Sequence, residues 1–81
     1  MSVKLQLSPR QQEILRRVVA EFVQTGRPVG SKTLVDEAGV SASASTVRAE
    51  LAELESLGLL THPHTSAGRV PTERGLSLIH I

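Results

Sequence analysis

Groups that could bind phosphate are concentrated in the segment THPHTSAGRVPT, residues 61–72, which contains no acidic residue. The guanidinium of Arg69 could pair with a phosphate or enter a narrow minor groove of DNA. The other side chains of this segment that could bind phosphate oxygens are His64, Thr65 and Ser66. The segment therefore predicts contact with a nucleic acid, although the same residues also suit an ordinary turn.

Two histidines in the same segment raise the question of a metal or catalytic site. His62 and His64 alternate, so on a strand both rings would lie on one face. The chain has no cysteine, however, and no nearby carboxylate is placed to complete a metal site. The glycines form no phosphate loop, and no ordering of Ser, His and Asp is typical of a hydrolase. We therefore expect no enzyme activity, no cofactor and no metal; a small hydrolase or metal protein is the least favoured alternative.

The helical run ASTVRAELAELESLG, which precedes this segment, could read DNA bases. On a helical wheel, Val47, Leu51 and Leu54 share one side. The residues that point the opposite way are all small: Ser45, Ala49, Ala52 and Ser56. Such a face can lie deep in a major groove, where alanine contacts a thymine methyl group and Ser or Thr bonds to base edges or phosphates. The alternative is a solvent-facing helix in which alanine favours helicity.

Further candidate contacts surround this run. Thr46 and Arg48 occupy its two flanks. Its N-terminal N–H groups, next to a cap at Ser43 or Ser45, would favour a phosphate. Lys32 and Thr33 are candidate clamps on the DNA backbone, although Lys32 also suits a plain solvated surface.

The first element that must support these residues is a helix beginning after Ser8. Ser8 can cap it, Pro9 suits its first position, and Gln11 completes a capping box. Gly26 is placed to end it, with Pro28 following. The apolar stripe of this helix consists of Ile14, Leu15, Val18, Val19, Phe22 and Val23.

Two further helices and a hairpin follow. A short helix opens at Gly30-Ser31, with Leu34, Val35 and Ala38 facing inward, and Gly39 ends it. A turn leads to the third helix, residues 43–57, which Gly58 closes, and this order is typical of a helix-turn-helix. Strands are expected at residues 59–62 and 70–72, the second at an edge because Pro71 cannot donate to a ladder. We predict a mainly α fold with a small β-hairpin, a winged helix-turn-helix of three helices plus a wing; Thr72 could also cap a helix starting at Glu73.

Length and composition set the limits of this prediction. The chain has 81 residues, enough for one domain that buries about 60% of its unfolded surface. The net charge of +1 does not itself predict nucleic-acid binding, but Glu50, Glu53 and Glu55 precede a stretch free of acids. No apolar run could span a bilayer, and the N-terminus lacks the features of a signal peptide. We therefore expect a soluble cytoplasmic protein.

Three blocks of the sequence resemble one family of bacterial repressors. QQEILRRVVAEFVQTGRPVGSKTL, STVRAELAELESLGLL and HPHTSAGRVPTERG are similar to the N-terminal DNA-binding domain of the HrcA family of heat-inducible transcription repressors. The resemblance covers residues 7–75. It implies a recognition helix at residues 43–57 and a wing at residues 64–69. Ala49 departs from the family, which often has asparagine there, so a polar base contact at this position is not expected.

The resemblance also implies partners. Members of the family repress chaperone operons by binding an inverted-repeat operator as homodimers, and the GroE chaperonin keeps them active. For this chain, the resemblance thus implies double-stranded DNA as ligand, a homodimer in the full-length protein and the chaperonin as a partner. The alternative is a winged-helix module used for protein–protein contact, which would require an exposed apolar wing face.

The end of the chain departs from the family pattern. After Gly75 the family continues with an aromatic-rich segment, whereas this chain reads LSLIHI. One back-translation of these six residues matches the transposon mosaic end used in sequencing libraries. Our hypothesis is a DNA-binding domain at residues 1–75 from a truncated gene, followed at residues 76–81 by a non-native tail from adapter read-through.

Overall fold

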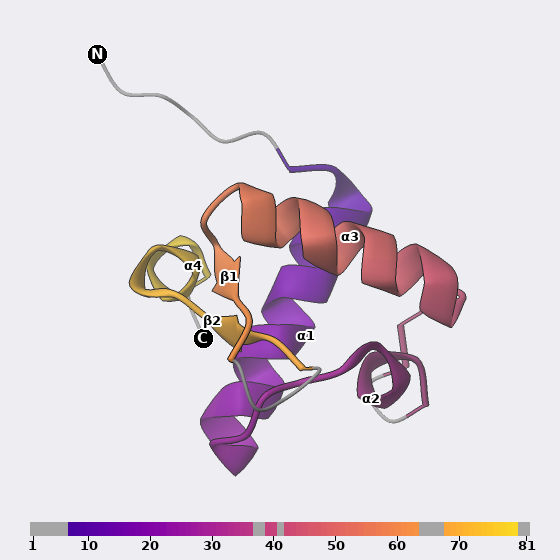
Figure 1. Ribbon diagram of the computed structural model, residues 1–81, viewed down its shortest axis with the longest axis horizontal. Coiled ribbons are helices and arrows are strands. Elements are labelled where there is room, and N and C mark those ends of the chain that lie inside the picture. Colours follow the sequence, from indigo (N-terminus) through magenta and orange to yellow (C-terminus); the bar gives the residue numbers. More distant parts are fainter. Residues whose placement is uncertain (1–6, 37–38, 41, 64–67, 80–81) are drawn as a thin grey trace.

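The computed structural model describes residues 7–36, 39–40, 42–63 and 68–79 (Figure 1). Within these ranges the chain forms four helices and one two-stranded antiparallel sheet. In chain order the elements are α1 (Pro9–Thr25), α2 (Ser31–Asp36), α3 (Ala44–Ser56), β1 (Leu60–Thr61), β2 (Val70–Pro71) and α4 (Glu73–Leu78). The predicted mainly helical, winged helix-turn-helix fold is confirmed, with α4 as an additional helix after the wing.

Helix α1 begins and ends where the sequence predicts. The Gln11 backbone N–H donates to Ser8 Oγ at 3.1 Å, and the Ser8 N–H donates to Gln11 Oε1 at 3.0 Å, which completes the capping box. Gly26 ends the helix with a φ of 69°, a conformation that glycine adopts without strain. The predicted stripe is wrong at its last member, because Val23 is 66% exposed. It lies on the end of α1 that projects past the other helices (Figure 1).

The helix-turn-helix consists of α2, a turn and α3. Gly39 turns the chain with a φ of 73°, and the Val40 N–H then donates to the Leu34 carbonyl at 3.1 Å. Of the two candidate caps for α3, Ser43 is the one used, since its Oγ accepts from the Thr46 N–H. Ala38, predicted to face inward, lies outside the described residues.

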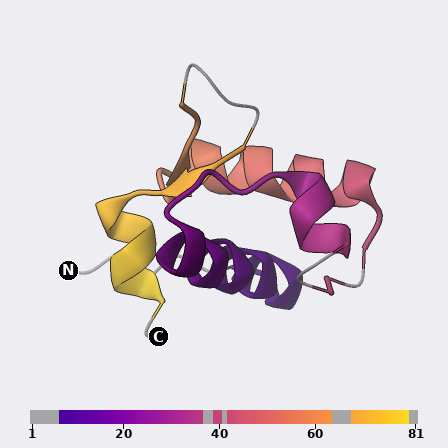
Figure 2. The same cartoon turned by 90° about the horizontal axis from the view of Figure 1, so that it is seen from below.

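The wing strands are shorter than predicted. Leu60 pairs with Pro71 and Thr61 pairs with Val70, so each strand has two residues. Pro71 has no N–H to extend the ladder, which limits the pairing on that side. Figure 2 shows that the strands lie on the same side of the molecule as α3, with α1 on the opposite side.

A single residue between α1 and α2 joins the base of the wing. The Val29 N–H donates to the Arg69 carbonyl, and the Arg69 N–H donates to the Val29 carbonyl, both at 2.8 Å. This bridge was not predicted from the sequence. It ties the linker between the first two helices to the returning strand of the wing.

Helix α4 packs tightly against the start of the wing. Thr72 caps it as predicted, with its Oγ1 accepting from the Gly75 N–H at 3.1 Å. The same hydroxyl donates to the Gly58 carbonyl at 2.7 Å, and the Thr72 N–H donates to the Leu59 carbonyl at 3.0 Å. The last two of these hydrogen bonds hold the start of α4 against the two residues that precede β1.

The core is aliphatic and is formed by residues of α1, α2, α3 and β1 together with the segments that connect them. Its fully or nearly fully buried members are Ile14, Leu15, Val18, Val19, Val29, Leu34, Val40, Val47, Leu51, Leu54, Leu59 and Leu60. Phe22 is half-buried at its edge. No polar or charged side chain is buried in the part of the chain that the structure describes. In the same part, none of the helices has the length and apolar character required to cross a membrane.

Candidate nucleic-acid interface

Helix α3 presents a surface of small side chains to solvent. Val47, Leu51 and Leu54 are buried in the core, as predicted. The residues on the opposite side are exposed: Ser45, Ala49, Ala52 and Ser56. Because these side chains extend only one or two heavy atoms beyond Cα, the backbone of α3 can approach a docked molecule closely. The face predicted to enter a major groove is therefore accessible.

The first turn of α3 places hydroxyl groups at one end of this face. Ser43 Oγ accepts from the Thr46 N–H at 3.2 Å and donates to Thr46 Oγ1 at 3.0 Å. The Thr46 hydroxyl accepts this bond, which leaves its own proton to donate to a ligand. Ser45 is exposed beside them. Three of the predicted contact residues thus share one helix end.

A surface groove brings together cations from three separate elements. It has a volume of about 370 Å³, and its lining residues are Gly30, Ser31, Lys32, Arg48, Leu51 and Arg69. Lys32 and Arg48, from α2 and α3, are both exposed. Two solvated cations from adjacent helices can each meet a phosphate on the same DNA backbone. The groove adjoins the small face of α3 because Arg48, which lines the groove, lies about one helical turn from Ser45 and from Ala52.

Thr33, predicted as a partner of Lys32, faces a different hollow. That hollow has a volume of about 400 Å³ and is lined by Glu21, Thr25, Arg27, Pro28, Val29 and Thr33. The structure therefore separates these two consecutive residues. Only Lys32 is placed beside Arg48.

Arg69, the predicted leading contact of the wing, is held by an acidic residue. Its Nε lies 2.8 Å from Glu55 Oε1 on α3, and the two side chains are 18% and 36% exposed. In the sequence, Glu55 stands out only as one of three acidic residues that precede a stretch free of acids. Glu55 lies seven residues after Arg48, two turns along the same helix face, but nothing local in the sequence indicates that Arg69 reaches it.

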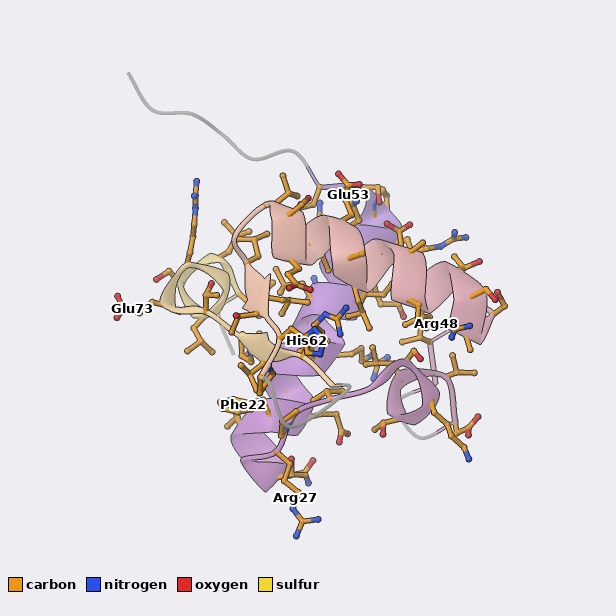
Figure 3. All side chains as sticks on the ribbon, viewed as in Figure 1. Phe22, Arg27, Arg48, Glu53, His62 and Glu73 are labelled. Carbon is orange, nitrogen blue, oxygen red and sulfur yellow. The ribbon has the colours of Figure 1, made fainter. Side chains whose placement is uncertain are left out.

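The other acidic residues of α3 lie away from the groove. Gln11 Nε2 on α1 donates to Glu50 Oε1 at 3.2 Å. Figure 3 shows Glu53 on the side of α3 facing away from α2, whereas Arg48 lies on the side near α2. Glu50 and Glu53 are thus separated from Arg48 around α3, whereas Glu55 pairs with Arg69. This arrangement leaves Lys32 and Arg48 as a local cationic surface on a chain with a net charge of only +1.

The wing itself is only partly described. His64, Thr65 and Ser66 lie outside the described residues, whereas His62 is exposed at the base of the wing (Figure 3). The large apolar side chains exposed among the described residues are Val23, Leu76 and Leu78, none of which belongs to the wing. The described part of the wing therefore lacks the apolar face that a protein-contact module would need. In the described ranges, no group of three or more His, Asp or Glu residues could hold a metal ion.

Several residues that shape this surface were not predicted from the sequence as part of the site. Gly30, Ser31 and Leu51 line the groove, yet they were interpreted only as a helix start and a core position. Val29 and Glu55 position Arg69. A signal existed for Val29, since an apolar residue between Pro28 and Gly30 suggests a buried extended segment. No sequence signal indicates that Arg69 is the residue that pairs with Val29.

Comparisons with known proteins match the chain to a family of DNA-binding domains. Residues 6–81 match a family described as winged helix-turn-helix transcription repressor, HrcA DNA-binding. The heat-inducible transcription repressor HrcA of Thermomicrobium roseum is 57% identical over 74 residues, which are 91% of this chain and 21% of that protein. The repressor of the same name from Syntrophobacter fumaroxidans is 53% identical over 70 residues, 86% of this chain and 20% of that protein.

A solved structure shares the fold. A crystal structure described as that of a hypothetical protein at 2.2 Å resolution superposes with a TM-score of 0.84 and 38% sequence identity. The match covers 88% of this chain and 23% of that one. The chain spans about a fifth of the length of the curated relatives it matches.

Proposed function

Because this chain belongs to the HrcA family of winged helix-turn-helix transcription repressors, we propose that it binds double-stranded DNA with α3 in the major groove. The observation that carries the proposal is the exposed small face of α3 beside the groove that holds Lys32 and Arg48. Ala49 and Ala52 allow close approach and can contact thymine methyl groups. Lys32 and Arg48 then bind phosphates at the edge of the same major groove.

The remaining predicted residues have supporting roles in this proposal. Ser45 and Thr46 bond to base edges or phosphates at the start of α3, where Ser43 holds the first turn in place. Thr33 contacts the backbone separately from Lys32, since the two face different hollows. The wing residues that we propose to contact phosphates are His64, Thr65 and Ser66.

The finer parts of the proposal concern the whole protein. We propose that two copies bind an inverted-repeat operator of chaperone operons, because a two-fold arrangement of recognition helices requires a palindromic site. The homodimer, the cytoplasmic location on the bacterial nucleoid and the GroE chaperonin as partner follow from the family resemblance. Repression by such a dimer is the function we assign to the full-length protein.

We also propose a domain boundary at Gly75, with residues 76–81 arising from adapter read-through. Helix α4 continues to Leu78, and Ile79 packs against the edge of the core. The family match also runs to residue 81. Sequencing the genomic locus decides the matter: a native stop codon directly after Ile81 would reject read-through.

DNA binding is tested with the chain itself and a pool of random-sequence duplexes. Repeated selection should enrich one sequence, and the chain should bind it weakly, with an affinity that falls as salt increases because phosphate contacts release counterions. Lys32→Gln and Arg48→Gln should each reduce the magnitude of the slope of log K against log salt by about one.

Arg16→Gln is the matched control. Arg16 is an exposed cation on α1, and this helix lies on the side of the molecule opposite α3 (Figure 2), so removal of the Arg16 charge should leave the slope unchanged. A chain that enriches no sequence and shows no salt slope does not bind DNA. Equal effects of all three substitutions would mean that net charge, not the groove, governs binding.

A further inference from the structure

Arg69 is the point at which three segments of the fold meet. Its backbone is bridged to Val29 in the linker between α1 and α2 by two hydrogen bonds of 2.8 Å. Its Nε is buried and lies 2.8 Å from Glu55 Oε1 on α3. The residue itself belongs to the returning arm of the wing. The side chain of Arg69 and its backbone N–H and C=O groups therefore connect the wing to both the recognition helix and the linker.

The neighbouring glycine leaves this junction little freedom to shift. A Cβ at Gly68 would lie 2.9 Å from the Pro28 Cβ and 2.9 Å from the Val29 backbone nitrogen. Val29 is itself 2% exposed. Because backbone meets backbone here, the wing cannot slide along the linker without breaking the bridge. The ion pair between Arg69 and Glu55 then limits movement of the wing toward or away from α3.

We infer that Arg69 is a positioning residue: its ion pair with Glu55 sets the position of the wing relative to α3, and phosphate binding in the groove falls to Lys32 and Arg48. This inference rests on the proposed DNA binding. Glu55 and a phosphate are both anions that compete for one guanidinium. Transfer of Arg69 to a phosphate would leave the half-buried carboxylate without this cation, close to a second negative charge.

The two possible roles of Arg69 predict opposite effects of Glu55→Gln. If Arg69 contacts DNA, loss of the carboxylate frees the guanidinium and removes a repulsive charge, so binding becomes tighter. If Arg69 positions the wing, loss of the carboxylate releases the wing, so binding becomes weaker although a negative charge has been removed. Whether Glu55→Gln binds DNA more tightly or more weakly therefore shows whether Arg69 contacts DNA or positions the wing.

The test measures the affinity of each variant for the duplex enriched by selection and the slope of log K against log salt. The measurements are made well below the melting temperature of each variant. Glu55→Gln and Arg69→Gln should each weaken binding roughly twofold to tenfold. The double variant E55Q/R69Q should bind no more weakly than whichever single variant has the lower affinity. The reciprocal swap E55R/R69E should recover most of the lost affinity. The salt slope of Arg69→Gln should equal that of the unmodified chain, since no phosphate contact is lost.

Glu53→Gln is the control for charge, because it removes an exposed carboxylate from the same helix on the side facing away from α2. It should leave binding unchanged or slightly tighter. Amide hydrogen exchange of Val29 and Arg69 gives a readout without DNA: it should accelerate in Glu55→Gln and remain unchanged in Glu53→Gln.

Four results would overturn the inference while leaving DNA binding intact. The first three are tighter binding by Glu55→Gln, a salt slope reduced by about one in Arg69→Gln, and additive losses in the double variant. A lower melting temperature with unchanged affinity would also overturn it, since the pair would then only stabilise the fold. Failure of the proposed function is distinct, because in that case the unmodified chain would not bind the duplex at all.

Discussion

At the scale of single residues, steric contact with a neighbouring segment, more than helix propensity, requires glycine at position 75. Gly75 is buried in the first turn of α4, and a Cβ at this position would overlap the carbonyl oxygen of Leu59. That carbonyl already accepts a hydrogen bond from the Thr72 N–H. It therefore cannot move aside without weakening the contact that holds α4 beside the wing.

We expect Gly75→Ala to lower the melting temperature of the chain. Alanine is favoured over glycine in a helix by about 1 kcal/mol, but displacing α4 from Leu59 should cost more than this. Thermal unfolding followed by circular dichroism measures the change. Ser77→Ala, at an exposed position of the same helix, should leave the melting temperature equal or higher. A Gly75→Ala chain as stable as the original would show that α4 moves without cost.

At the scale of elements, the helix ends were predictable because their signals are local. Ser8, Pro9 and Gln11 define the start of α1 within four residues, and Thr72 likewise caps α4. Glycine supplies the left-handed conformation where α1 ends. Each of these interactions forms between neighbours in the chain, so the residue types alone indicate them.

The candidate site was predictable only in part, because some of its contacts join residues that lie far apart in the sequence. The small outer face of α3 follows from helical periodicity. The groove instead depends on how α2, α3 and the wing pack, and the partners Glu55 and Arg69 are separated by the whole hairpin. Arg69 was therefore recognised as a cation but not as the partner of an acid. No local pattern encodes that pairing.

Two helix caps provide a prediction at this scale, because only one of them lies beside the proposed interface. Ser8→Ala and Ser43→Ala each remove a capping hydroxyl and should each lower the free energy of unfolding by about 1 kcal/mol. Only Ser43→Ala should also weaken DNA binding, since it loosens the first turn of α3. Denaturant unfolding and duplex titration of both variants measure these effects. Equal affinities would place the start of α3 outside the interface.

At the scale of the whole molecule, one copy presents one recognition helix and a few cations. A single module makes few phosphate contacts, which accounts for the weak binding expected of this chain. An inverted repeat offers two such sites on one face of the duplex when their centres are one helical turn apart. The affinity of the full-length repressor would then arise from joining two copies.

Joining two copies of this chain through a flexible glycine- and serine-rich linker should reproduce that gain. We expect the tandem chain to bind an inverted repeat of the selected sequence on the order of 100-fold more tightly than a single copy does. Moving the half-sites apart by half a helical turn should abolish most of the increase, because the second module would then face the opposite side of the duplex. Affinity that is insensitive to this spacing would argue against a palindromic operator.

The purely aliphatic core has a consequence for how these measurements are made. The chain contains no tryptophan and no tyrosine, and Phe22 is its single aromatic ring apart from three histidines. The protein is therefore almost transparent at 280 nm, and the absorbance of a bound duplex can be followed with little protein background. In NMR spectra, the phenyl signals of the chain come from Phe22 alone. This half-buried ring thus reports, without any label, on the packing of α1 against the core.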